Sequence, residues 1–91
     1  MSVKIKKGFV LRKIGPQYMA VPYGAMTDEV KGMISLTESG YLLWQTLDQG
    51  VDTKETLTEI LLREYDVEEE DAARDVDEFV LFLAQMGVLE T

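Results

Sequence analysis

The alternation of hydrophobic and polar residues changes its period at Leu36. Before this residue, short segments alternate with a period of two, which is typical of strands because successive side chains point to opposite faces. Turn signals such as Gly15-Pro16 separate the segments, and short connections favour antiparallel pairing. The segment Gly24 to Glu29 is expected to be a loop. The predicted strands lie near residues 9–14, 17–23 and 30–36.

Beyond this point the apolar residues recur every three or four positions, which indicates amphipathic helices. Thr37 can cap the first helix, and Asp52 with Glu55 resembles a capping box before the second. Gly50 is a suitable residue just beyond the first helix, and Gly87 closes the third. The predicted helices lie near residues 38–48, 53–65 and 70–86.

These elements describe an α+β fold in which a three-stranded antiparallel sheet is followed by three helices, a winged-helix-like arrangement. Residues 1–91 are expected to form a single domain, because a chain of this length has room for one core. An apolar content of 46% is sufficient for a modest core. The core residues predicted from the helical stripes are Trp44, Leu57, Leu61, Val76 and Leu83.

The inventory of reactive side chains argues against catalysis. The chain has no histidine and no cysteine, so it lacks the commonest general base and the usual zinc ligands. The acidic run Glu68 to Asp71 fails as a calcium loop, because counting from Asp66 puts Asp71 at the required glycine and Asp77 at the required glutamate. The run instead suits the start of the third helix, where negative charge is favourable. We therefore expect no enzymatic activity, no metal site and no cofactor.

Charge divides the chain into two unlike parts, although the net charge is −8. Residues 1–35 carry six basic and two acidic residues, whereas the remainder carries three basic and fifteen acidic residues. The two parts could simply be solvated faces of opposite sign, or the basic part could steer a partner that carries acidic residues. The third helix offers only Arg74 against five acidic residues, so nucleic acid is not an expected partner.

No segment of the sequence suggests a membrane partner. The longest apolar run, Phe79 to Ala84, is far shorter than the roughly 20 residues that span a bilayer. The N-terminal residues lack the features of a signal peptide, and the absence of cysteine gives no sign of an oxidising compartment. A cytoplasmic protein is therefore expected.

The third strand is a candidate binding site if it lies at the end of the sheet. An edge strand offers unpaired backbone groups to an extended peptide, and Gly32 would let another backbone approach closely, so Gly32→Pro is expected to abolish binding. Phe79 and Phe82 exceed the apolar stripe that the core needs, although both could also be ordinary core residues. The same edge could instead pair with a second copy of the chain and form a homodimer.

Five segments occur in a characteristic order: V-P-Y-G, M-I-S-L-T-E-S-G-Y-L-L-W, L-D-Q-G-V-D-T-K-E, L-L-R-E-Y and D-V-D-E-F-V-L-F-L-A-Q-M-G-V-L. Together they resemble the PqqD-like family, whose members are RiPP recognition elements that bind the leaders of ribosomally made, modified peptides. The resemblance covers roughly residues 9–89. Thr37 stands where the family often has asparagine, but threonine also caps helices.

The resemblance implies a non-catalytic chaperone for peptide modification of the kind found in PQQ biosynthesis. The leader peptide would add beside the third strand, be clamped by the third helix, and pass to a modifying enzyme, often a radical S-adenosylmethionine maturase that supplies the chemistry. The alternative is a winged-helix-like regulatory or scaffold module that binds a protein surface. The peptide-binding residues that the resemblance implies are Lys31, Gly32, Met33, Ile34, Ser35, Asp75, Phe79 and Phe82.

Overall fold

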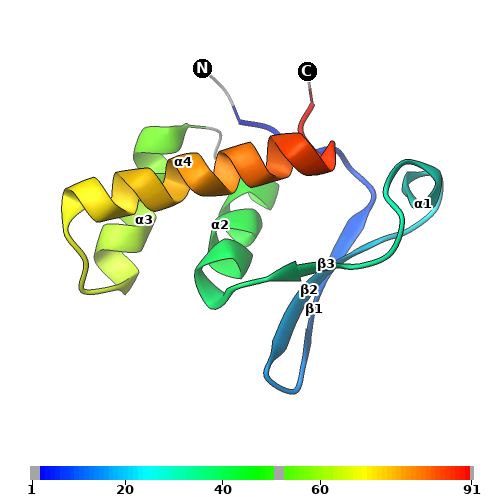
Figure 1. The fold of residues 1–91 in the computed structure, drawn as a ribbon, viewed down its shortest axis with the longest axis horizontal. Coiled ribbons are helices and arrows are strands. Elements are labelled where there is room, and N and C mark those ends of the chain that lie inside the picture. The colour runs from blue at the N-terminus through cyan, green and yellow to red at the C-terminus, as the bar shows by residue number, and fades with distance from the viewer. Residues whose placement is uncertain (1–2, 51–52, 91) are drawn as a thin grey trace.

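The structure is a computed structural model that describes residues 3–50 and 53–90. It confirms the predicted α+β fold, since a three-stranded antiparallel sheet precedes the long helices, and α4 lies across α3 and α2 (Figure 1). A short helix, α1, is inserted between the second and third strands. The elements are β1 (Phe9–Ile14), β2 (Gln17–Pro22), α1 (Met26–Glu29), β3 (Ile34–Leu36), α2 (Glu38–Asp48), α3 (Lys54–Glu64) and α4 (Glu69–Met86).

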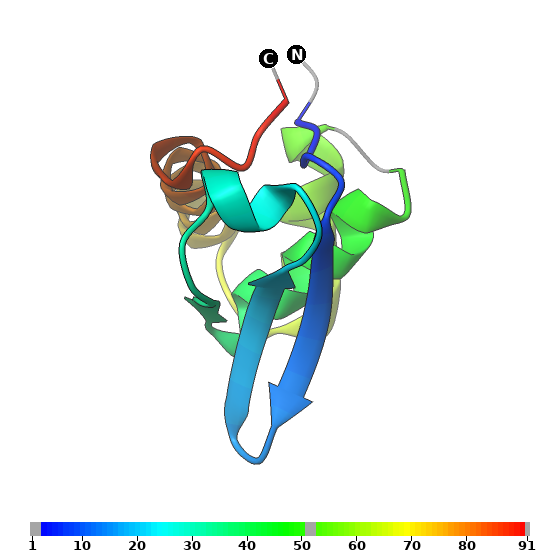
Figure 2. The same cartoon turned by 90° about the vertical axis from the view of Figure 1, so that its right-hand side faces the viewer.

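The strand order is β1-β2-β3, so β2 is central and β1 and β3 form the edges of the sheet. β1 and β2 form a hairpin whose two-residue loop has Gly15 at φ +60° followed by Pro16, a conformation that glycine adopts without steric cost. The tip of this hairpin projects away from the helices (Figure 2). β3 contributes three residues to the sheet and leads directly into α2.

The third strand is shorter than predicted, because it begins at Ile34 and not at residue 30. Extending its pairing by two residues would set Gly32 opposite Pro22, and proline has no N–H to donate to the ladder. Gly32 itself has φ +80°, which lies outside the strand region. Residues 30–33 therefore form the connection into β3.

The segment predicted as a loop contains α1, so that prediction was wrong. The N–H of Val30 donates to the C=O of Met26 at 2.9 Å, and the hydroxyl of Thr27 donates to the C=O of Gly24 at 2.7 Å. Met26 is buried over Gly8, where a Cβ atom would lie 2.9 Å from the Cβ of Met26. One apolar residue among polar neighbours gives no helical period, so the sequence pattern could not show this turn.

Three helix boundaries follow the predicted residues. Thr37 caps α2, since its Oγ1 accepts a hydrogen bond from the N–H of Gly40 at 3.0 Å. Gly87 closes α4 at φ +75°, and Gly50 follows α2 at φ +97°. Both glycines adopt the left-handed conformation that commonly ends a helix.

The cap of α3 differs from the predicted capping box. Its capping residue is Thr53, whose Oγ1 accepts from the N–H of Thr56 at 3.2 Å. The predicted cap, Asp52, lies outside the described residues. The capping residue is thus one position later than the predicted Asp52, and α3 begins at Lys54.

The predicted core is confirmed. Each predicted core residue is at most 3% exposed: Trp44, Leu57, Leu61, Val76 and Leu83. Trp44 of α2 lies edge-on to Phe9 of β1, with the ring centroids 5.3 Å apart, and this contact packs α2 onto the sheet. Ala20 and Ile34 bring the central and third strands into the same core.

The first and last described segments of the chain pair with each other. The N–H of Lys6 donates to the C=O of Val88 at 2.8 Å, and the N–H of Glu90 donates to the C=O of Lys4 at 2.8 Å. Val88 is fully buried. The segment that follows α4 is therefore anchored beside the segment that precedes β1.

Candidate functional site

The hydrogen-bonding pattern of the sheet decides which backbone groups reach its open edge. The N–H of Tyr23 donates to the C=O of Gly8 at 2.9 Å, just beyond the β1–β2 ladder. Hydrogen-bonded pairs alternate with non-hydrogen-bonded pairs along antiparallel strands. Counting inward from Tyr23, Tyr18 and Ala20 belong to non-hydrogen-bonded pairs with β1, so their N–H and C=O groups point toward β3.

β3 consequently presents Ser35 to the open edge. Ile34 and Leu36 lie opposite Ala20 and Tyr18, so their backbone groups are directed to β2. Ser35 alternates with them, and its N–H and C=O point away from the sheet. An extended peptide can pair with these two groups as a further strand.

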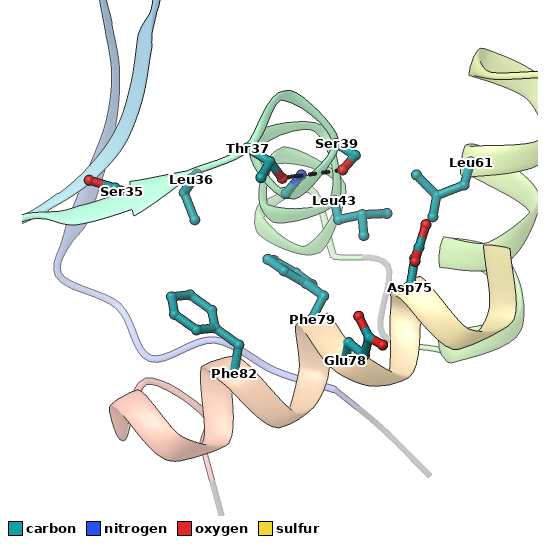
Figure 3. Close-up of a pocket in the computed structure, with 11 residues that line it drawn as sticks. Ser35, Leu36, Thr37, Ser39, Leu43, Leu61, Asp75, Glu78, Phe79 and Phe82 are labelled. Carbon is teal, nitrogen blue, oxygen red and sulfur yellow. Dashed lines mark hydrogen bonds between the residues drawn. The ribbon is translucent and has the colours of Figure 1, made fainter. Parts of the chain in front are cut away.

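A groove of about 390 Å³ lies beside this edge, between β3, the start of α2, and α4. Figure 3 shows the rings of Phe79 and Phe82 projecting from α4 toward β3 and the start of α2. Leu43 and Leu61 are nearly fully buried, whereas both phenylalanines are partly buried and can contact a bound molecule. The apolar residues that line the groove are Leu36, Leu43, Leu61, Phe79 and Phe82.

Gly40, in the first turn of α2, lies beside both the capping hydroxyl of Thr37 and the ring of Phe79. A Cβ atom at this position would lie 3.4 Å from Cε1 of Phe79 and 3.2 Å from Oγ1 of Thr37. Glycine inside a helix costs about 1 kcal/mol relative to alanine, and here the tightest contact of an added Cβ would be with the capping Oγ1 of Thr37, whereas its contact with Phe79 would be an ordinary van der Waals one. Gly40 thus lines the groove between the helix cap and the aromatic ring.

The rim of the groove is polar and acidic. The hydroxyls of Thr37 and Ser39 lie 3.2 Å apart at the start of α2 (Figure 3). On α4, the carboxylates of Asp75 and Glu78 flank the groove, and Ser35 completes the rim on β3. Among the described residues that line the groove, none is a lysine or an arginine.

A second hollow, of about 290 Å³, adjoins the groove, and Thr37, Ser39 and Asp75 line both. Within it the hydroxyl of Tyr65 donates to Oε1 of Glu38 at 3.0 Å. Burial raises the pKa of Tyr65 above its ordinary value, and the hydrogen bond to Glu38 raises it further. The phenol therefore stays protonated at neutral pH and holds the Glu38 carboxylate at the start of α2.

The structure brings together half of the site residues predicted from the sequence. Ser35, Asp75, Phe79 and Phe82 all line the groove, and their part in binding stays a prediction. Ile34 is 2% exposed, so its side chain belongs to the core.

The three other predicted residues, Lys31, Gly32 and Met33, do not line the groove. They are exposed and precede β3 in the chain. Their placement within an edge strand was wrong, because the positive φ of Gly32 and the missing N–H of Pro22 end the ladder before it reaches them.

Several residues of the groove were not predicted as site residues: Leu36, Thr37, Ser39, Gly40, Leu43, Leu61 and Glu78. Two signals could have identified some of them. Glu78 follows Asp75 by three positions, which places both on one side of a helix. Gly40 is a glycine within a predicted helix, which usually has a packing reason. Nothing local in the sequence pointed to the hydroxyls of Thr37 and Ser39.

Two further findings concern the described part of the chain. None of its helices is long and apolar enough to cross a membrane. Residues 3–50 and 53–90 contain no group of three or more acidic, histidine or cysteine side chains arranged to hold a metal ion. What the groove does offer is outward-facing backbone, aromatic surface, hydroxyls and carboxylates.

The architecture is that of a small α+β module whose sheet edge faces a helix across a groove, and two solved structures share its fold. One is "TbiB1 in Complex with the TbiA(beta) Leader Peptide", with a TM-score of 0.75 at 23% identity, covering 96% of this chain and 94% of that chain. The other is "Lasso peptide synthetase B1 complexed with the leader peptide", with a TM-score of 0.76 at 20% identity over the whole of both chains. No curated protein sequence matches the chain.

The sequence itself identifies the family. The family described as Coenzyme PQQ synthesis protein D (PqqD) matches residues 25–89, which is more than half of the chain. The chain belongs to the PqqD family, as its resemblance in sequence predicted.

Proposed function

We propose that this chain is a non-catalytic adaptor that binds the leader of a ribosomally made precursor peptide and presents it to a modifying enzyme. The observation that carries the proposal is the outward-facing backbone of Ser35, directly beside the apolar groove under α4. Membership of the PqqD family and the two leader-bound structures of similar fold support it. In this proposal residues 1–91 act as a single peptide-binding domain.

The leader would add to β3 as a further strand. Its backbone would exchange hydrogen bonds with the N–H and C=O of Ser35, which gives affinity with little dependence on sequence. Alternate side chains of a strand share one face, so one of them would reach Phe79 and Phe82 and provide specificity. An affinity in the micromolar range, about −8 kcal/mol, would suit a peptide that is ordered on binding and released afterwards.

The chemistry of modification would belong to the partner enzyme. The chain has no cysteine that could ligate an iron–sulfur cluster, so a radical S-adenosylmethionine maturase would bring its own. We place this step in the cytoplasm, because a ribosomally made precursor is first available there.

Phe82→Ala should weaken leader binding about tenfold, because Phe82 contributes aromatic surface to the groove. The probe is a fluorescently labelled leader of the short precursor encoded beside the gene for this chain, titrated by anisotropy. Leu81→Ala is the matched control, since Leu81 is the adjacent residue on α4, is 57% exposed and does not line the groove. Equal affinities of the two variants would argue against the groove as the binding site.

Amide chemical shifts test the proposed function as a whole. The same leader should shift the signals of residues 34–40 and 72–86, which flank the groove. Shifts confined to α3 would favour a scaffold module that binds a protein surface. If sedimentation of the peptide-free protein shows a dimer that the leader dissociates, the edge of β3 also pairs with a second copy.

Leader association should slow as salt increases. Lys31 is exposed just before β3, and other basic residues of the N-terminal part can add to its attraction for acidic residues of a leader. Such exposed charges are screened beyond about 8–10 Å at physiological ionic strength. Stopped-flow association rates that do not change between low and high salt would exclude electrostatic steering and leave strand addition untouched.

A further inference from the structure

The two ends of the groove differ in their chemistry. Phe82 lies toward Leu36 of β3, Phe79 lies against the start of α2, and Asp75 lies toward Leu61 of α3, with Glu78 beside it on α4 (Figure 3). A bound strand would therefore meet an aromatic surface at one position and carboxylates at another. Strand addition uses backbone groups and apolar surface, so it gives no role to the carboxylates of Asp75 and Glu78.

Neither carboxylate has a cationic partner in the described part of the chain. Two neighbouring acidic residues on α4 do have one, since Asp71 pairs with Arg74 and Asp77 pairs with Lys54. No described lysine or arginine nitrogen lies within 4.0 Å of the carboxylate of Asp75 or Glu78. The ion pairs of α4 therefore leave the two carboxylates that line the groove, Asp75 and Glu78, without a described cationic partner.

Glu38 adds a third carboxylate close to the same place. It lines the hollow that adjoins the groove at Asp75, and Tyr65 holds it through a hydrogen bond of 3.0 Å. The described lining of this hollow also lacks lysine and arginine. A peptide in the groove would exclude water from these groups, so an apolar or acidic side chain beside them would be penalised.

We propose that the groove selects a peptide segment that combines an apolar side chain, seated on Phe79 and Phe82, with a lysine or arginine directed to Asp75 and Glu78; this inference rests on the proposed function. A cation would satisfy both carboxylates through charge-assisted hydrogen bonds. Arginine suits the site best, because its planar fork can donate to two acceptors at once. The net charge of −8 would also attract such a segment.

The geometry of α4 sets the spacing within the segment. Asp75 and Phe79 are four residues apart, which is about 6 Å along a helix, and Asp75 and Phe82 are about 10 Å apart on the same scale. Side chains on one face of a strand recur at every second residue, about 6.8 Å apart. The basic residue is therefore expected two positions from the apolar residue when that residue sits on Phe79. The separation over Phe82 falls between two and four strand positions, so either spacing is expected there.

Selection from a displayed library of random linear peptides tests this inference. The wild-type protein should enrich a basic residue two or four positions from an aromatic or aliphatic one. Asp75→Asn combined with Glu78→Gln keeps the shape of both side chains, so it should retain the apolar preference and lose the basic one. A synthetic peptide from the wild-type pool should bind this double variant about 3- to 10-fold more weakly.

Glu59→Gln combined with Glu64→Gln is the matched control, because it changes the net charge equally and neither residue lines the groove or the adjoining hollow. This variant should keep the basic preference, and a loss of the preference here too would overturn the inference, since net charge would then be its cause. Wild-type enrichment of apolar residues without a basic one would also overturn it, while leaving the proposed function in place. If no peptide is enriched and the precursor leader shifts no signal of β3, both proposals fail.

Discussion

Ser35→Pro should weaken leader binding at least about tenfold while the protein stays folded. The N–H of Ser35 points to the open edge, whereas Ile34 and Leu36 direct their backbone groups to β2. Proline removes only the outward donor, and its ring occupies space that an incoming strand needs. Edge strands accept proline where the missing N–H would face solvent. The dissociation constant of the leader and a thermal melt of each variant are the measurements.

Ser35→Ala is the matched control for this prediction. It removes the hydroxyl of an exposed side chain and keeps the backbone N–H, so leader affinity should change by less than about threefold. If the proline variant melts like the alanine variant and also binds the leader as tightly, the leader does not add to β3.

Leu83→Ala should lower the free energy of unfolding by about 2–5 kcal/mol. Leu83 of α4 is fully buried, so truncation removes apolar contacts and leaves a cavity in the core. A small domain has only about 5–10 kcal/mol of stability in total, and the variant would be marginal. Urea unfolding followed by tryptophan fluorescence provides the measurement, because Trp44 lies in the same core.

Leu81→Ala should change the free energy of unfolding by less than about 0.5 kcal/mol, since Leu81 is 57% exposed on the same helix. This variant removes the same number of atoms as Leu83→Ala, so burial is the variable that the comparison isolates. Similar urea midpoints for the two variants would show that the register of α4 in the core is wrong.

The helices could be predicted because the spacing of apolar residues within each segment shows which side of the helix is buried. Val76 and Leu83 are seven residues apart and both are fully buried, which is the repeat that a helix packed on one side requires. The caps at Thr37 and Gly87 are also local, since each acts on a backbone group within a few residues. Such features need no knowledge of the partner elements.

The start of the third strand could not be predicted in the same way. The alternation of apolar and polar residues continues through residues 30–33. The ladder nevertheless ends there because of Pro22 on the neighbouring strand. Only the pairing register of β2 and β3 reveals that Pro22 would face Gly32. Gly32→Pro is consequently a poor test of strand addition. Proline cannot adopt the φ of +80° found at Gly32, so this variant would disturb the connection into β3 in addition to any effect on binding.

Only those site residues could be predicted that add apolar surface beyond the stripe needed for the core. Phe79 and Phe82 could be singled out because they add apolar surface beyond the buried stripe of α4, and both line the groove. Thr37 and Ser39 reach the same groove only because α4 lies over the start of α2. That packing is a long-range contact, which no local period records.

The pairing of the first and last described segments has a consequence for protein engineering. The backbones of Lys4 and Glu90 are joined by a hydrogen bond, and these two segments lie on the side opposite the tip of the β1–β2 hairpin (Figures 1 and 2). A short linker could close the chain into a ring, and a new start could be cut at the exposed Gly15-Pro16 loop to give a circular permutant. The module could equally be inserted into a surface loop of another protein, because its chain would enter and leave the host at nearly one point.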